Sequence, residues 1–136
     1  MMAFPSMSVH ARVERGRAIA VRFAVILLVA PSSLFADVPV AQRAEVEHLF
    51  EYVRTSKCQI ERNGQLYAAA DAEEHMQKKY EHFRDEIDST EKFIELVASR
   101  SEVSKKPYLV RCGSKMGMPT RGWLLAELAR FRAGSH

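Results

Sequence analysis

Four stretches of the chain repeat apolar residues three or four positions apart, the spacing of an amphipathic helix. We expect the first helix over 39–55. Asp71, with a glutamate three residues later, is expected to start the second in a capping box, and Ser89 or Thr90 and then Thr120 to cap the third and the fourth. The predicted inward stripes are Val46, Leu49, Phe50 and Val53; Ala72, Met76, Tyr80, Phe83 and Ile87; Phe93, Ile94 and Val97; and Trp123, Leu124, Leu128 and Phe131.

Strand signals lie between these helices. Asn63-Gly64 separates two short runs and predicts a two-residue hairpin turn, because both residues tolerate positive φ. Such a turn sets Arg62 opposite Gln65, Ile60 opposite Tyr67, and Cys58 opposite Ala69.

A third strand is predicted over 107–112, where Tyr108, Val110 and Cys112 share one face by the period of two. The stretches 99–106 and 113–121 are expected to be loops. Helices and strands in this order predict an α+β fold, in which a small antiparallel sheet (the Asn-Gly hairpin plus one later strand) is packed by about four helices on one face.

The first 36 residues have the pattern of a secretory signal peptide. Basic residues precede an apolar run over 23–30, and a breaker and the tripeptide ending at Ala36 follow it. The run is shorter than the about 20 apolar residues that a membrane span needs. We expect cleavage after Ala36, which leaves one domain over 37–136; an uncleaved N-terminal anchor is the alternative.

Removing this leader changes the charge balance. The whole chain has 20 Lys and Arg against 17 Asp and Glu, and the leader holds four of the arginines and one acid. The remainder therefore has 16 of each sign, since 20 − 4 = 16 and 17 − 1 = 16. Such a balanced surface gives no electrostatic footprint for nucleic acid or for an anionic membrane surface. We expect neither partner, and no stable membrane insertion after cleavage.

Cys58 and Cys112 are the two cysteines of the chain. In an exported protein such a pair predicts a disulfide, and a reactive thiol is the alternative. If the apolar face of the third strand joins the apolar face of the hairpin, Cys112 lies beside Cys58. The predicted alternation of side chains along the strands and the predicted disulfide therefore support each other.

The most suggestive polar set is His75, Lys79 and His82, on one face of the second helix beside its buried stripe. A partly shielded Lys or His can be tuned toward neutral pH and act as an acid or a base. Arg62 and Tyr67 flank the hairpin turn, and both residue types anchor binding interfaces. An ordinary polar helix flank and a plain hairpin are the alternatives.

Other chemistry has weaker support. Glu45, His48 and Glu51 share a helix face, but one helix alone is poor evidence for a metal site, and we predict none. The serines of the 99–106 loop lack a nucleophile motif and are expected to be solvated. No phosphate loop, dinucleotide fingerprint or zinc cluster occurs, so we predict no cofactor.

The chain resembles a family of small exported bacterial proteins, a domain of unknown function with YfeK-like members. The resemblance covers 41–132, and its most specific part is the R-N-G…Y…H…K-Y run. It implies a periplasmic location in a Gram-negative bacterium and brings no assigned activity. It also implies Ser-Gly before Pro107-Tyr108, where this chain has Ser104-Lys105-Lys106. The matching residues are Cys58, Arg62-Asn63-Gly64, Tyr67, Ala72, His75, Lys79-Tyr80, Phe93-Ile94, Pro107-Tyr108-Leu109-Val110 and Trp123-Leu124.

The sequence thus favours a non-enzymatic periplasmic module that binds an envelope component or protein. No complete catalytic set is present, and the candidate binding residues Arg62, Tyr67, His75 and Lys79 suit an anionic partner or small anionic ligand. The alternative is a small envelope hydrolase with His75 or Lys79 as acid or base.

Overall fold

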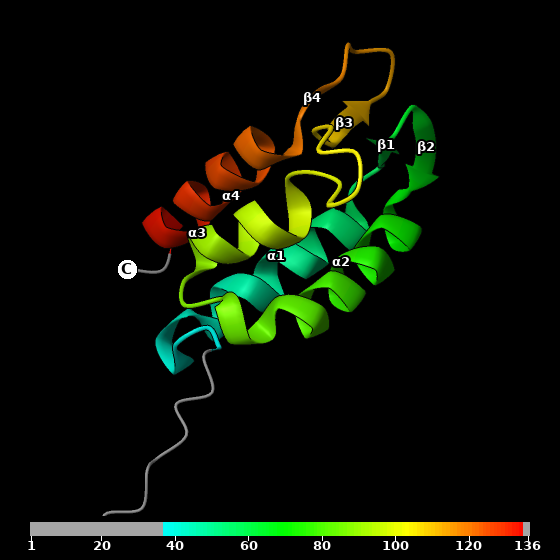
Figure 1. The fold of residues 1–136 in the computed structure, drawn as a ribbon. Helices are drawn as coiled ribbons and strands as arrows, with labels where there is room; N and C mark the ends of the chain where they lie inside the picture. Colours follow the sequence, from blue (N-terminus) through cyan, green and yellow to red (C-terminus); the bar gives the residue numbers. More distant parts are fainter. Residues whose placement is uncertain (1–36, 135–136) are drawn as a thin grey trace, which may run out of the picture. The chain divides into compact units, whose positions relative to one another are not determined.

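The computed structural model describes residues 37–134, and the predicted leader and its last residue, Ala36, lie outside them. The fold is α+β, as predicted (Figure 1). Its elements are, in order, η1 (Val40–Gln42), α1 (Arg43–Thr55), β1 (Cys58–Arg62), β2 (Gln65–Ala68), α2 (Ala69–Phe83), η2 (Arg84–Glu86), α3 (Thr90–Phe93), the π-helical turn η3 (Ile94–Ala98), β3 (Leu109–Cys112), β4 (Met118–Pro119) and α4 (Thr120–Gly134).

The sheet is antiparallel, with strand order β2-β1-β3-β4. Asn63 and Gly64 form the β1–β2 turn with φ of 51° and 81°, which confirms the predicted hairpin. Its register also matches, because Arg62 pairs with Gln65 and Ile60 with Tyr67. The predicted pair of Cys58 and Ala69 is wrong: β2 ends at Ala68, and the next residue begins α2.

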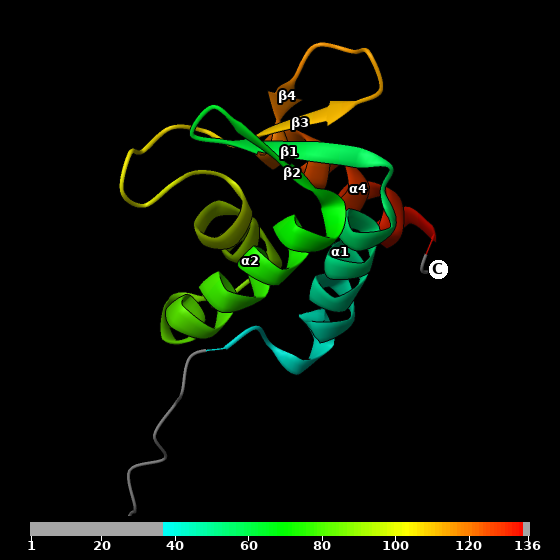
Figure 2. The ribbon, with the colours of Figure 1, turned by 90° about the vertical axis from the view of Figure 1, so that its right-hand side faces the viewer.

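Helices cover one face of this sheet. Figure 2 shows the four strands on one side, with α1, α2 and α4 together on the other. The core lies between these layers, and most of the predicted stripes contribute to it. Its most buried large side chains are Phe93, Leu49, Ile87, Ile94, Leu124, Val38, Val53, Val97 and Val110.

Two helix starts differ from the predictions, and the first of them is that α1 begins at Arg43, after the turn η1, and not at residue 39. The second helix begins at Ala69, and its N-cap, Ala68, makes no side-chain cap bond, so the capping box at Asp71 does not form. The hairpin strand leads straight into this helix, which fixes its start before Asp71 is reached. The cap of the third helix is confirmed, since Ser89 Oγ accepts a hydrogen bond from the Lys92 amide.

Thr120 begins α4 but is not placed as a simple cap. Its buried hydroxyl lies within hydrogen-bond distance of the Ala98 and Tyr108 carbonyls and donates its one proton there, and the Thr120 amide also donates to the Tyr108 carbonyl, at 3.0 Å. Thr120 therefore ties the start of α4 to the end of η3 and to the chain entering β3. Because both acceptors are distant in sequence, local helix rules do not reveal this role.

The third strand starts two residues later than predicted, at Leu109, because the Tyr108 amide donates to the Ser99 carbonyl at 3.0 Å. A fourth strand, Met118–Pro119, lies in the stretch that we expected to be a loop. It has two residues and thus no alternating pattern to detect. Its proline lies in an edge strand of the sheet, where the missing amide hydrogen removes no hydrogen bond between strands.

Cys58 and Cys112 are joined by a disulfide that links β1 to β3. The two residues are direct partners in the antiparallel register, with their Cα atoms 4.2 Å apart. The predicted pairing of these cysteines and the predicted approach of the two strands are therefore both confirmed.

The chain between η3 and β3 is held by several bonds. Arg100 bridges to Pro107, and the Ser101 amide donates to the Lys106 carbonyl at 3.0 Å. Ser101 is 6% exposed, and its hydroxyl oxygen accepts from the Ser104 amide, so the expectation of a solvated serine is wrong here. Lys105 has a φ of 58°, a left-handed conformation that glycine adopts more easily.

Candidate functional site

Arg62, at the end of β1, is the most unusual cation of the described residues. Its Nε is buried and has no hydrogen-bond partner among them, and none of their ion pairs includes it. The guanidinium lies over the ring of Tyr67, with Cζ 3.9 Å from the ring centre. Since buried donors are normally paired, this arginine has hydrogen-bonding capacity to spare.

His75, on α2, and Arg62 both line a small hollow beneath the sheet, which is described below. Its Nε2 is 3.4 Å from the hydroxyl oxygen of Tyr108, a long contact, and the two rings are arranged edge to face. Burial, followed by the charges of Arg62, Lys79 and Lys78, lowers the pKa of His75 to about 4. The imidazole is therefore neutral near pH 7 and is surrounded by positive charge.

Lys79 follows one helical turn later and is 8% exposed. Its ammonium group donates to the Arg100 carbonyl at 2.8 Å and lies 3.9 Å from Glu102 Oε1. Burial lowers the pKa of Lys79, while Glu102 opposes that shift. Glu102 also pairs with Lys105, at 3.2 Å, so one carboxylate faces two ammonium groups.

We call Arg62, His75 and Lys79 the basic cluster. Two hollows meet at it, and both are lined by His75 and Tyr108. The inner one, which we call the crevice, has about 20 Å³ of space, room for one water molecule or a methyl group. The outer one, which we call the groove, has about 490 Å³ and is lined by His75, Lys78, Lys79, His82, Phe83, Ser101, Glu102, Val103 and Tyr108.

The predicted site residues are thus only partly brought together. Arg62 and His75 share the crevice, and His75 and Lys79 share the groove. Tyr67 lines neither hollow, and its ring instead packs against the Arg62 guanidinium. His82 is exposed at the rim of the groove, against the ring of Phe83.

The sequence pattern did not indicate three further parts of the site. Tyr108 was placed on the inward face of its strand, yet its hydroxyl oxygen reaches His75. The Arg100 carbonyl and the Glu102 carboxylate come from the 99–106 stretch, whose polar composition has no periodic signal. The β1–β3 register pairs Glu61 with Leu109, and the residues next to this pair, Arg62 and Tyr108, line the same hollow.

The other polar face, with Glu45, His48 and Glu51, makes separate contacts. Glu45 binds Arg132, His48 Nε2 lies 2.7 Å from Glu127 Oε1, and Glu51 pairs with Arg54. The part of the chain that the structure describes contains no group of three or more potential metal ligands. Within that same part, no helix is both long enough and apolar enough to cross a membrane.

Comparisons with known proteins give a family but no activity. Neither the search of curated proteins nor that of solved structures found a match. A family model described as "Family of unknown function (DUF5329)" matches residues 40–132, which contain the basic cluster, the crevice, the groove and the disulfide. This description gives no location, so export stays a prediction. The match spans more than half of the chain, and the protein therefore belongs to the DUF5329 family.

Proposed function

We propose that this protein is an exported, periplasmic module that binds an anionic group of an envelope component or protein at the basic cluster. The observation that carries the proposal is the buried Arg62 Nε, which has no hydrogen-bond partner among the described residues. A guanidinium offers paired N–H donors whose geometry fits a carboxylate or a phosphate.

The surrounding charges support an anionic ligand. Burial lowers the pKa of His75, and repulsion from the positive charges of Arg62 and Lys79 lowers it further. Glu102 is the one acid that lines the groove, and Lys105 already shares it. A bound anion relieves this repulsion in a partly desolvated place, where charge interactions are stronger than in water.

Export is supported by two independent features. Residues 1–36 have the pattern of a cleavable leader. The Cys58–Cys112 bond is of a kind that persists in oxidising compartments and is rare in the cytosol of mesophiles. Together they favour the periplasm as the compartment in which the protein binds its ligand.

A small hydrolase is the second candidate. A neutral His75 within 3.4 Å of the Tyr108 hydroxyl and a Lys79 of lowered pKa are groups that can move protons. However, the one serine among the groove-lining residues is Ser101, and its hydroxyl oxygen accepts from the Ser104 amide. No hydrogen bond of the described residues joins Ser101 to Lys79 or His75 to make an activated nucleophile.

A titration with simple anions tests the binding proposal. Acetate, succinate and inorganic phosphate are added to the purified protein while the NMR signals of the His75 ring and the Arg62 side chain are followed. We expect saturable shifts with at least one of these probes, because the ligand pairs with Arg62 and raises the pKa of His75.

Three variants locate the site. Arg62→Gln, His75→Ala and Lys79→Ala are expected to weaken binding by about tenfold or more, the effect of about 1.4 kcal/mol. Lys57→Gln and Arg54→Gln remove exposed cations outside the cluster and serve as matched controls. Equal affinity in all five variants would contradict the named site, and turnover of peptide or cell-wall substrates that needs His75 would favour the hydrolase.

A further inference from the structure

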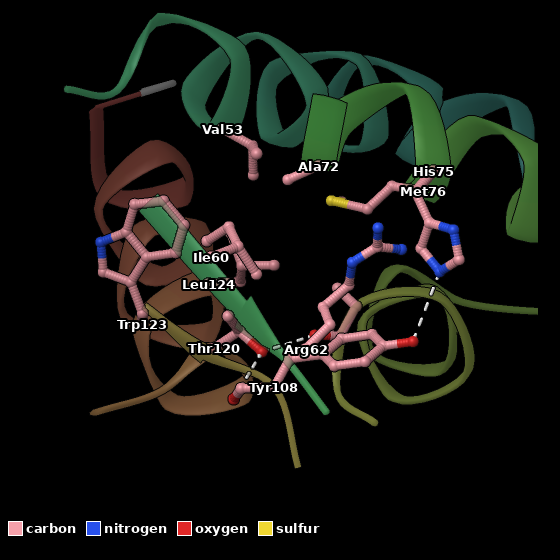
Figure 3. A pocket seen from close by; sticks show the side chains of 11 residues that line it. Val53, Ile60, Arg62, Ala72, His75, Met76, Tyr108, Thr120, Trp123 and Leu124 are labelled. Carbon is pink, nitrogen blue, oxygen red and sulfur yellow. Dashed lines mark hydrogen bonds between the residues drawn. The ribbon is translucent and has the colours of Figure 1, made fainter. Parts of the chain in front are cut away.

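The crevice has an apolar interior and a basic end. Figure 3 shows Arg62 reaching between Met76 and His75, while Val53, Ile60 and Leu124 lie deeper in the same hollow. A ligand that fits both parts needs a small apolar group close to an anionic one.

The crevice lies against the larger groove. His75 and Tyr108 line both hollows, and the contact between them is long, at 3.4 Å, so two weakly bonded side chains form the boundary between the hollows. The groove, with about 490 Å³, has room for a much larger part of a ligand than the crevice. This arrangement suits the end of a chain molecule better than a small free acid.

We propose, on the basis of the proposed function, that the site takes the free C-terminal carboxylate of a peptide whose last side chain is small and aliphatic. The carboxylate pairs with the Arg62 guanidinium, the last side chain enters the crevice, and the preceding residues lie in the groove past Lys79. The proposal rests on the two adjoining hollows, the unpaired Nε and the charge of the lining.

The chemistry of a chain end explains this choice. In a terminal amino acid the side chain and the carboxylate are attached to the same carbon, so an anion and an apolar group are presented side by side. A phosphate monoester places an oxygen and further atoms between the two. The space of about 20 Å³ admits a methyl group and excludes an aromatic ring.

The rest of the groove favours the same occupant. Lys78, Lys79 and His82 line it; Glu102 is the acid of this lining and lies near Lys79, while Glu74 pairs with Lys78 at 2.7 Å. Val103, which also lines it, is 96% exposed and offers an apolar contact to a chain lying there. These residues fit a peptide whose positions before the terminus include acidic and apolar side chains.

Synthetic peptides test the inference with ligand changes alone. The purified protein is titrated by NMR or calorimetry with N-acetyl-Ala-Ala, its C-terminal amide, N-acetyl-Ala-Phe, free alanine and acetate. We expect N-acetyl-Ala-Ala to bind about tenfold tighter than acetate or free alanine, and the amide and the Phe peptide to lose at least that factor.

The outcomes separate this inference from the proposed function. If acetate and the peptides bind equally well through Arg62, the anion-binding function stands and the peptide terminus is wrong. Free alanine or acetate as tight as the peptide would assign the site to small acids and overturn the inference. No binding of any probe would overturn both.

Two variants add a test within the protein. Arg62→Lys keeps the charge but loses the paired donors, so the preference for the free carboxylate over the amide is expected to fall. Met76→Ala enlarges the crevice and is expected to shift the preference from N-acetyl-Ala-Ala toward N-acetyl-Ala-Leu. Thermal unfolding checks that each variant is folded, and an unchanged preference in a folded Met76→Ala protein would contradict the role of the crevice.

Discussion

At the scale of single residues, the sign of the charges around His75 leads to a measurable pH dependence. The pKa of His75 is about 4 in the folded protein because of burial and the cations beside it, whereas an unfolded histidine has a pKa of about 6.5. Between these values the unfolded chain binds more protons, so the free energy of unfolding falls as the pH decreases from about 6.5 to about 4. This contribution is fully present above that window.

The first prediction follows. NMR titration of the His75 ring should give a midpoint near pH 4, and Arg62→Gln should raise it because one repelling charge is removed. His75→Gln should flatten the loss of stability between pH 6.5 and 4, as measured by urea unfolding. His82→Gln, an exposed position on the same helix, is the control. A midpoint near 6.5 in the wild type would show that the cluster is not electrostatically coupled.

Lys105 carries a second prediction at this scale. A non-glycine residue with φ of 58° is held in a region that costs about 1–2 kcal/mol relative to the right-handed one. Lys105→Gly removes this strain, although glycine also loses more entropy on folding. We expect the free energy of unfolding to stay equal or to rise by up to about 1 kcal/mol. Lys106→Gly, the exposed neighbouring position, should lower it; equal losses at both positions would argue against the strain.

At the scale of elements, local patterns predicted most of the helices and the hairpin. Apolar residues three or four positions apart located α1 and α4, and Asn63-Gly64 predicted the turn and the register of β1 and β2. Periodicity did not locate contacts between elements. The hydroxyl of Thr120, for example, reaches Ala98 and Tyr108 because three chain segments meet there.

This junction gives the third prediction. Thr120→Val has nearly the same shape but removes the hydroxyl donor from the buried Ala98 carbonyl, while the backbone amide of residue 120 still donates to the Tyr108 carbonyl at 3.0 Å; the protein should therefore lose about 1–3 kcal/mol of stability. Thr120→Ser should recover most of it. Thr55→Val is the matched control, since the Thr55 hydroxyl is exposed and bonds only within its own helix, to the Glu51 carbonyl at 2.8 Å. Chemical denaturation measures all three, and a Thr120→Val protein as stable as the control would refute the junction.

The site was half predictable for a related reason. His75 and Lys79 are one helical turn apart, so a helix pattern alone places them together. The place of Arg62 beside them depends on how the hairpin packs on α2, and that of Tyr108 on the β1–β3 register. The position of Glu102 depends on the conformation of a loop that is held by backbone hydrogen bonds, and residue types alone do not predict that conformation.

At the scale of the whole molecule, the disulfide and the predicted export belong together. The bond closes a loop of 54 residues in sequence separation, which should stabilise the fold by about 4 kcal/mol in the chain-entropy model. The fourth prediction is that the Cys58→Ala, Cys112→Ala double variant loses about this free energy of unfolding in urea titrations. A loss below about 1 kcal/mol would show that the reduced chain is already well constrained.

Intact-mass measurement of the protein expressed with its own leader completes this prediction. We expect a mass that begins at Asp37 and cysteines that react with an alkylating agent only after reduction. A full-length mass with two free thiols from a native host would contradict export. Site variants such as Arg62→Gln should leave this mass pattern unchanged, which separates the location of the protein from its ligand.

The position of the disulfide also has a consequence for the proposed export of the chain. The bond joins β1 and β3, the strands that carry Arg62 and lead away from Tyr108, so one oxidation event fixes the backbone on both sides of the site. Under the proposed export, the newly made chain lacks about 4 kcal/mol of a total stability of about 5–15 kcal/mol while its thiols are reduced. It therefore unfolds more readily before secretion, which favours threading through a narrow translocation channel. Under the same proposal, the bond forms after export, and the covalent link between β1 and β3 then holds the two strands beside the site together.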